Sequence, residues 1–324
     1  MSLLTKKAIH DALESLDLSG RRRHAAGRRW REYEMDVCAR TRAAMSSFGP
    51  LIDEAASSIK LYAGRGRRPS LSPQQKTKLL LIKLLVGKSN RTFSNMLALS
   101  SSMTGIDVSY KSVERLYSDE GIRLLLSNVF CLILRRSDVS GIGACGDGTG
   151  YSLTIKKHYA SYAEELKKGT SKGLKRSFVF SFALMDLDTW MYACYGNGMK
   201  SEKEAFDRAM DMLSGSGIKI ASVRLDRYYS DSSCVSRFGD AKVYVIPKSN
   251  ATTRGSAAWK ASMRGFVEAT KEYLEEYYRR NNSESGFSTD KRGLGWTIPQ
   301  RRFDRIDCAI LCRYVWHNLF RLRQ

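Results

Sequence analysis

The chain has 324 residues, of which 43% are hydrophobic and 27% are charged, so it can build a core and is not a low-complexity tail. Its 54 Lys and Arg residues outnumber 33 Asp and Glu residues, which gives a formal net charge of +21. Such a surplus indicates a polyanionic partner, and nucleic acid is the first candidate. Charge alone excludes neither a ribosomal nor a membrane-surface protein, but the apolar runs 79–86 and 129–134 are too short to span a bilayer.

The cysteine and histidine content points to a reducing compartment. Seven Cys residues lack paired spacing, and they form no zinc motif with the four His residues. With the charge, and with no secretory segment visible, this predicts a cytoplasmic, nucleoid-associated protein. Cys308 and Cys312 lie one helical turn apart in an apolar stripe, which favours core packing.

Residues 1–63 are predicted to form a basic helical region, with a cluster of arginines between residues 21 and 31. Residues 64–70 form a predicted basic linker that contains Arg65, Arg67 and Arg68. Its glycines free the backbone and Pro69 cannot continue a helix, so it is a flexible arm. Such an arm can lie in a DNA minor groove, and an ordinary solvated linker is an equally open interpretation.

Residues 71–136 are predicted to form a helical DNA-binding domain. Ser72 and Pro73 are a helix start signal, and the helix over 76–86 should end at Gly87. Further helices are expected over 92–99, 111–117 and 121–134. Short helices joined by polar turns predict a helix-turn-helix-like unit, and a plain packing subdomain remains the alternative.

Residues 137–324 are predicted to form an α/β domain. Strands over 142–147 and 151–155 bracket a Gly-Asp-Gly-Thr-Gly turn, and strands over 176–185 and 191–195 bracket a second turn at 186–189. A helix over 201–213, strands over 218–226 and 242–246, and helical segments over 257–280 and 304–322 follow. This order predicts a mixed sheet covered by helices on both faces.

Two carboxylates are predicted to end central strands. Asp147 follows the first apolar strand and Asp226 closes a later one, although Asp is disfavoured in strands. Neighbouring carboxylates repel each other, and Mg²⁺ or Mn²⁺ relieves that repulsion because both take oxygen ligands. The open alternative is that each is a turn residue or a helix cap. The remaining candidates fit turns better than a site: Asp186, Asp188 and Asp231.

A row of four functional side chains is predicted on one helical face: Tyr277, Arg280, Glu284 and Lys291. The carboxylate suits a metal, the cations suit phosphates, and the ring suits stacking on a splayed base. Because Asn and Gly are poor in a helix interior, the segment is alternatively two helices with Asn282 or Ser283 as cap.

This row resembles the Y-R-E-K signature of the DDE insertion-sequence transposases: Tyr, two residues, Arg, three residues, Glu, six residues, Lys. All four positions match that spacing, and Asp147 and Asp226 match the first and second family acids in context and order. The resemblance covers residues 71–324 and is most specific over 141–292. The spacing from Asp226 to Glu284 is too short for the large β-domain that some relatives insert there, so a hairpin pathway is not implied.

The resemblance implies a ribonuclease-H-like fold for residues 137–324, preceded by an all-helical N-terminal region. It implies two Mg²⁺ or Mn²⁺ ions held by the catalytic acids Asp147, Asp226 and Glu284. It also implies that a homodimer binds double-stranded DNA, both transposon terminal repeats and target DNA. The expected DNA contacts are Tyr277, Arg280 and Lys291, and Lys248 in Ile-Pro-Lys-Ser-Asn adds a possible phosphate contact.

The expected function is therefore a metal-dependent DNA transposase that cleaves transposon ends and joins the 3′-hydroxyl to target DNA. One alternative is a domesticated or inactive DNA-binding protein derived from a transposase. Another is a cellular ribonuclease-H-like nuclease, which has no evident use for the row from Tyr277 to Lys291. A tyrosine recombinase is disfavoured, since neither His24 nor His317 has an Arg three residues on.

Overall fold

The structure is a computed structural model that describes residues 4–14, 30–59, 70–153 and 178–322. Its first part is helical, as predicted, and α3 begins and ends where the sequence indicates. Ser72 caps α3 in a capping box, and Gly87 ends it with a left-handed φ of 68° that favours glycine. The helices are α1 (Lys6–Glu14), α2 (Trp30–Ser57), α3 (Pro73–Val86), α4 (Asn90–Leu99), α5 (Ser101–Thr104), α6 (Tyr110–Leu116) and α7 (Glu120–Arg136).

The predicted basic arm lies outside the described residues, and so do Arg65, Arg67 and Arg68. The helix-turn-helix interpretation of residues 71–136 and the domain boundaries stay predictions. The helical part nevertheless packs directly on the rest of the chain, because α7, α2 and α3 all contact the C-terminal helix α14 (Phe303–Arg321). The buried Trp316 indole of α14 donates to the Leu81 carbonyl of α3 at 2.9 Å.

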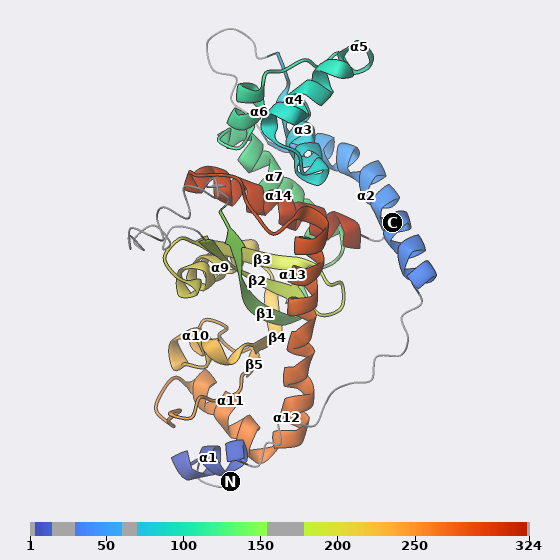
Figure 1. Cartoon of the computed structure of the whole chain (residues 1–324). Helices are drawn as coiled ribbons and strands as arrows, with labels where there is room; N and C mark the ends of the chain where they lie inside the picture. The colour runs from blue at the N-terminus through green and yellow to red at the C-terminus, as the bar shows by residue number, and fades with distance from the viewer. Residues whose placement is uncertain (1–3, 15–29, 60–69, 154–177, 323–324) are drawn as a thin grey trace.

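A five-stranded sheet lies at the centre of the molecule (Figure 1). Its order is β3-β2-β1-β4-β5. The strands are β1 (Gly141–Ser152), β2 (Phe178–Asp186), β3 (Tyr192–Gly198), β4 (Lys219–Leu225) and β5 (Lys242–Tyr244). The first three are antiparallel neighbours, whereas β4 is parallel to β1 and β5 is parallel to β4. The predicted mixed sheet is confirmed.

The prediction of a Gly-Asp-Gly-Thr-Gly turn is wrong, because β1 continues through it as one strand. Residues 144–152 of β1 pair without interruption with β2, so Asp147 lies in the middle of a strand and not at its end. The glycines serve packing: a Cβ on Gly146 would come 2.6 Å from Leu184, and one on Gly148 would overlap Glu202. The glycines are therefore required by close packing and not by a turn of the chain.

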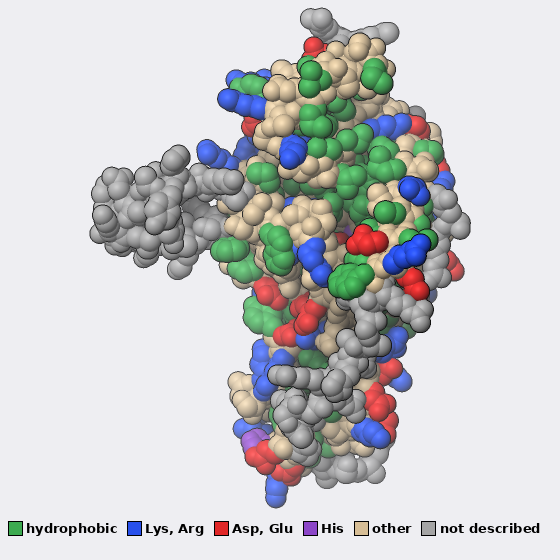
Figure 2. Space-filling view, turned by 45° about the vertical axis from the view of Figure 1, so that its right-hand side comes forward, with side chains coloured by type: hydrophobic (Ala, Val, Ile, Leu, Met, Phe, Trp, Pro, Cys, Tyr) green, Lys and Arg blue, Asp and Glu red, His purple; other side chains and the backbone are tan. Residues whose placement is uncertain are grey.

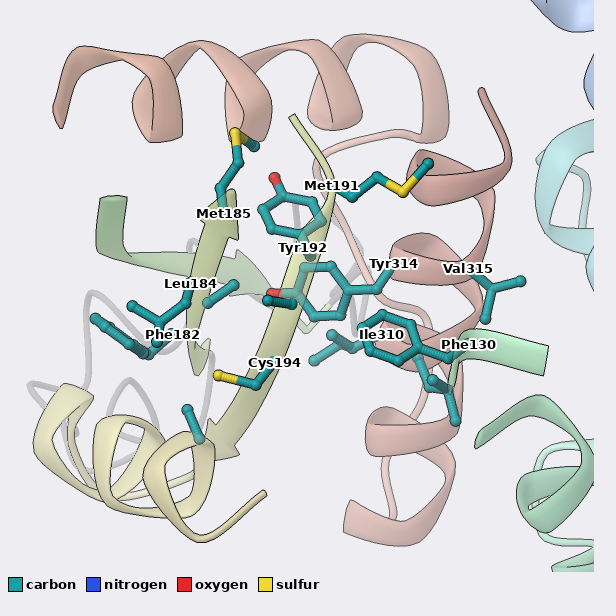
Figure 3. Close-up of a cluster of buried hydrophobic side chains, with 14 of the residues drawn as sticks. Phe130, Phe182, Leu184, Met185, Met191, Tyr192, Cys194, Ile310, Tyr314 and Val315 are labelled. Atoms are coloured by element: carbon teal, nitrogen blue, oxygen red, sulfur yellow. The ribbon is translucent and has the colours of Figure 1, made fainter. Parts of the chain in front are cut away.

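Helices cover both faces of the sheet. Helix α9 (Glu202–Ser216) packs against β3 and β2 on one face, where Phe206 meets Phe182 edge to face. Helices α13 (Asn281–Leu294) and α14 cover the other face. Figure 3 shows Tyr192 of β3 and Tyr314 of α14 meeting in the buried core of that second face, with ring centroids 4.7 Å apart. Cys308 and Cys312 are buried, which confirms their predicted packing role.

The chain between β4 and α13 forms the lower part of Figure 1. It contains a 3-10 turn η2 (Arg227–Tyr229), α10 (Ser232–Ser236), α11 (Ala257–Glu268), α12 (Thr270–Tyr277) and a 3-10 turn η3 (Tyr278–Arg280). The predicted helical segment over 257–280 is interrupted at Ala269, which leaves the helical region of the backbone. Helix α12, η3 and α13 then follow one another directly and lead from this part to the middle of the sheet.

Basic side chains are spread over the face of the molecule that Figure 2 shows. Figure 2 shows Lys and Arg along the length of one face, with acidic side chains among them, and not in a single patch. This matches a charge surplus that both halves of the sequence carry. No helix in the described part of the chain is long and apolar enough to cross a membrane.

Candidate active site

Asp147 points from the middle of β1 toward α13. Its Oδ1 accepts a hydrogen bond from the Gly148 amide at 2.9 Å, and its side chain is 16% exposed. Burial raises the pKa of Asp147 to about 7, although Arg280 and the Gly148 amide lower it, and Asp226 and Glu284 raise it further. Desolvation therefore outweighs the nearby cation, and the carboxyl is poised to gain or lose a proton near neutral pH.

Asp226 follows β4 and lies beside Asp147 because β1 and β4 are parallel. Their register pairs Gly146 with Leu225, the residues that precede the two acids. The Oδ1 of Asp226 accepts from the Tyr228 amide at 2.8 Å and so caps η2. The cap alternative of the sequence therefore applies to Oδ1, and Oδ2 lies toward Arg280, which also faces Asp147.

Glu284 reaches the same place from α13. This helix begins at Asn281 directly after η3 and has no side-chain cap, so the predicted cap at Asn282 or Ser283 is wrong. The physical reason is that the Ser283 hydroxyl bonds back to the Arg280 carbonyl at 2.8 Å, inside a continuous helical path. Glu284 is the most exposed of the three acids, at 53%.

One guanidinium joins the three carboxylates. Arg280 places its nitrogens 3.6 Å from Asp147 Oδ2, 3.4 Å from Asp226 Oδ2 and 2.8 Å from Glu284 Oε1. Burial alone would lower the pKa of Arg280, but the Tyr277 ring and the three acids leave it raised. Strand β1, the end of β4 and helix α13 thus converge on a single positive charge.

The helix end that precedes Arg280 is held by a second arginine, on β4. Arg224 is almost fully buried, forms an ion pair with Glu276 of α12 and donates from Nε to the Glu276 carbonyl at 3.3 Å. Its NH1 donates to the Ser222 hydroxyl at 2.6 Å. These contacts fix the end of α12 against β4, and η3 begins immediately after it.

The chain is 43% identical over 273 residues to the probable transposase for insertion sequence element ISA1214 of Archaeoglobus fulgidus. The match covers 84% of this chain and 82% of that protein. This chain belongs to the insertion-sequence transposases. No family model matches the transposase, and no solved structure matches it.

The other predicted DNA contacts, Tyr277, Lys291 and Lys248, lie at different places in the transposase. Tyr277 is buried, and its ring packs with Arg280 at 5.9 Å from the guanidinium carbon. Lys291 of α13 contacts β1 two residues after Asp147, where its Nζ donates to the Thr149 hydroxyl at 2.6 Å. Lys248 donates to the Tyr228 carbonyl at 2.9 Å, two residues after Asp226. The acids and Arg280 therefore form one cluster, with the two lysines at separate positions near its edges.

Sequence reasoning missed three residues of the transposase that surround Lys291: Thr149, Trp296 and Arg313. Thr149 belongs to the motif that the sequence predicted as a turn. A turn does not show that the Thr149 side chain lies on the same face of a strand as Asp147. Trp296 is 59% exposed and lies 5.4 Å from Lys291 Nζ. Arg313 is buried within α14, and no sequence signal distinguishes it from the other arginines of a basic chain.

Two of the three rival acids have structural roles, as the sequence indicated. Asp186 accepts from the Thr189 amide at 2.9 Å and from its hydroxyl, which closes the β2–β3 turn. Asp231 caps α10 by accepting from the Ser233 and Cys234 amides. Both carboxylates are occupied by local backbone donors, and so neither belongs to the acid cluster.

Proposed function

We propose that this insertion-sequence transposase is a DDE enzyme that cleaves transposon ends and joins the freed 3′-hydroxyl to target DNA. The observation that carries the proposal is the convergence of Asp147, Asp226 and Glu284 on Arg280. Three acids from separate parts of the chain share one cation, so their remaining negative charges repel each other, which costs stability. A functional role for the cluster would explain why this cost is tolerated. Family membership supports the DNA reaction, and the acid cluster supports its chemistry.

We also propose that residues 137–324 adopt the ribonuclease-H-like fold of DDE transposases. The sheet supports this, with three antiparallel strands followed by two strands parallel to β1, and helices on both faces. The first acid lies on the central strand and the second follows the adjacent parallel strand. The third comes from a helix that crosses the same face.

The three carboxylates have the chemistry to hold divalent metal ions. They are hard oxygen ligands, which Mg²⁺ and Mn²⁺ prefer, and their surroundings already accommodate the charge of Arg280. In the described part of the chain, three ligand atoms of His, Cys, Asp or Glu side chains lie within 4.8 Å of one another only at His10, Asp11 and Glu14 on α1. To hold an ion jointly, the three acids would have to draw closer together, and Arg280 would have to move aside. Two bound ions would supply activation of the attacking oxygen and stabilisation of the leaving oxygen.

The reaction uses two displacements at phosphorus. Water attacks the phosphodiester at the transposon end, the bond to the 3′ oxygen breaks, and that oxygen leaves as the new 3′-hydroxyl. This hydroxyl then attacks a target phosphodiester and displaces a 3′ oxygen of the target. Arg280 and Lys291 hold phosphates, and no covalent bond to the protein forms.

The partners are double-stranded DNA of the transposon ends and of the target, and a homodimer would hold two ends together. The net charge of +21 supports this, because basic side chains are spread over the face of the molecule that Figure 2 shows and can contact phosphates at several places. Residues 71–136 and the arm over 64–70 are the proposed DNA-binding elements outside the α/β domain. Lys248 is a further proposed phosphate contact.

The test uses the purified full chain and DNA that carries the terminal sequences flanking its gene. With Mg²⁺ or Mn²⁺ the protein should nick that DNA and join the 3′ end to a plasmid target. Asp147→Ala, Asp226→Ala and Glu284→Ala should each stop both steps and keep DNA binding. Asp188→Ala is the matched control, since it removes an acid outside the cluster. Cleavage that survives any of the three cluster variants would contradict the assignment of that acid, and binding without cleavage by the unaltered chain would indicate a domesticated DNA-binding protein.

A further inference from the structure

We propose that Tyr229 and Glu202 form a clamp that fixes the second acid, Asp226, relative to the first acid, Asp147. The proposal rests on the proposed function and deepens it, since it assigns two positioning residues to the acid cluster. The Tyr229 hydroxyl donates to Glu202 Oε1 at 2.5 Å, and this bond joins η2 to the start of α9. Three observations support the clamp.

The first observation is that Asp226 lies beyond the strand pairing. The ladder between β1 and β4 ends at Gly146 and Leu225, one residue before Asp226. The Asp226 carboxylate caps η2, and the Tyr229 amide donates to the Asp226 carbonyl at 3.0 Å. Asp226 and Tyr229 are therefore the two ends of one tight turn, and a contact that holds Tyr229 also holds Asp226.

The second observation is that Tyr229 is anchored in the core. Its side chain is fully buried, with its ring centroid 5.0 Å from that of Phe182 and 5.2 Å from that of Phe206. Phenylalanine would fill the same aromatic cluster, so the hydroxyl contributes its hydrogen bond to Glu202. Burial and that bond raise the pKa of Tyr229, so the phenol keeps its proton and donates it to the carboxylate.

The third observation is that Glu202 lies directly against β1 beside Asp147. A Cβ on Gly148 would come 2.1 Å from Glu202 Oε1, so the lack of a side chain at Gly148 makes room for this carboxylate. The Gly148 amide in turn donates to Asp147 Oδ1 at 2.9 Å. Glu202 therefore packs on the residue that orients the first acid and bonds to the residue that anchors the second.

Two other roles for Glu202 fit the structure less well. A metal ligand would have to face the acids, but Gly148 and Asp147 are neighbours in a strand, so Glu202 lies on the opposite face of β1 from the Asp147 carboxylate. An acid that only favours the helix dipole needs no partner, and Glu204 in the same turn already supplies such a charge. Neither role explains the bond to Tyr229.

The experiment removes one hydroxyl with Tyr229→Phe and measures two properties of the full chain without DNA. Hydrogen exchange in EDTA, followed by mass spectrometry, reports on the peptide that contains η2. Exchange there should rise about tenfold, because the turn loses a hydrogen bond to a charged group. Isothermal titration calorimetry measures the affinity for Mn²⁺, which should fall about tenfold because Asp226 is no longer fixed relative to Asp147.

Cleavage of terminal DNA separates positioning from a general loss of structure. In Tyr229→Phe the Mn²⁺ concentration for half-maximal cleavage should rise about tenfold, and the rate at saturating Mn²⁺ should stay within about twofold. Glu202→Ala should have the same effect, whereas Glu202→Gln should restore most of the affinity, because its amide oxygen still accepts from Tyr229. Loss of all cleavage in Glu202→Gln would instead indicate a metal ligand and would rule out the clamp.

Tyr314→Phe is the matched control, since it removes another buried phenol hydroxyl, which lies 2.7 Å from the Ser181 hydroxyl. It should change neither exchange at η2 nor the Mn²⁺ affinity, and an effect equal to that of Tyr229→Phe would contradict the proposal. Unchanged exchange in Tyr229→Phe, or faster exchange with unchanged Mn²⁺ affinity, would overturn it. If the unaltered chain bound no Mn²⁺ and cut no DNA, the proposed function would fail, and exchange at η2 would still decide whether the clamp holds Asp226.

Discussion

Strand β1 presents two faces that are built from alternating residues of the same short motif. Gly146 and Gly148 face α9, where any side chain would meet Leu184 or Glu202. Asp147 and Thr149 face α13, where they contact Arg280 and Lys291. One face is closed by packing, and the other is kept open for charged groups.

This comparison explains why glycines alternate with polar side chains in the motif. A strand alternates sides at each residue, so packing and chemistry can be assigned to neighbouring positions without interfering. The glycines let α9 approach closely enough to support the strand under the acid. The packed face therefore sets the rigidity of β1, and the polar face uses that rigidity to place a carboxylate. The two faces should respond differently to substitution.

The largest effect is expected on the polar face. Asp147→Asn should lower cleavage of terminal DNA by at least about a thousandfold, since the loss of a proposed metal ligand would remove several kcal/mol of transition-state stabilisation. The folded structure should persist, because Asn keeps the shape of the side chain. Single-turnover cleavage and circular dichroism measure the two. An unfolded variant would break the distinction between the faces.

The packed face should respond in stability. Gly196 of β3 also faces α9, and a Cβ there would overlap the helix backbone at Ala205 and Ala209. Gly196→Ala should therefore lower the free energy of unfolding by about 3 kcal/mol, because helix backbone cannot move aside as a side chain can. Gly215→Ala in α9 is the control, since nothing lies within 4 Å of its Cβ, and it should be neutral or slightly stabilising. Urea denaturation measures both, and equal values would contradict the packing argument.

Arg280 should compete with metal ions on the polar face. Arg280→Met should raise the affinity of the DNA-free protein for Mn²⁺ by about tenfold, because the carboxylates lose the cation they now share. Isothermal titration calorimetry measures this. Arg279→Met, which removes the same charge from the neighbouring residue paired with Glu276, should not change it. An Arg280→Met variant that binds Mn²⁺ no better than the unaltered chain would show that the guanidinium does not hold the acids from the metal.

A further effect depends on pH. Burial raises the pKa of Asp147 from 3.8 to about 7, so the folded state binds this proton more tightly than the unfolded state does. Its stability should therefore fall as pH rises from about 4 to about 7 and level off above that. In EDTA, Asp147→Asn should match the unaltered chain near pH 4 and be more stable near pH 8, by up to about 4 kcal/mol for a shift of about three pKa units. Thermal melts across this range measure the difference, and a constant difference would contradict the raised pKa.

Much of the fold and the site could be predicted from local signals. The start and end of α3 are encoded by Ser72, Pro73 and Gly87, because caps depend on only a few adjacent residues. The mixed sheet follows from the order of apolar strands and helices. The helical spacing from Arg280 to Glu284 predicts their contact, since residues four apart meet on one face.

The sequence-based predictions failed where a local sequence pattern is required by contacts with residues that are distant in the chain. The glycines around Asp147 are typical of a turn, but the side chains that require them come from β2, β4 and α9. Tyr277 has the family spacing, but it is buried in a helix, α12, that packs against the distant strands β4 and β5. Sequence spacing could not show either contact.

The sequence by itself determined the identity of the three acids, their order and the helical row that carries Glu284. Residue type and periodicity are local properties, and they limit the possible chemistry. Only the tertiary structure decided that these acids share Arg280, and that the exposed ring beside Lys291 is Trp296. Both depend on the parallel pairing of β1 with β4 and on the crossing of α13 over β1. Such contacts join residues that are distant in the chain, and their geometry is set by the packing of the whole sheet.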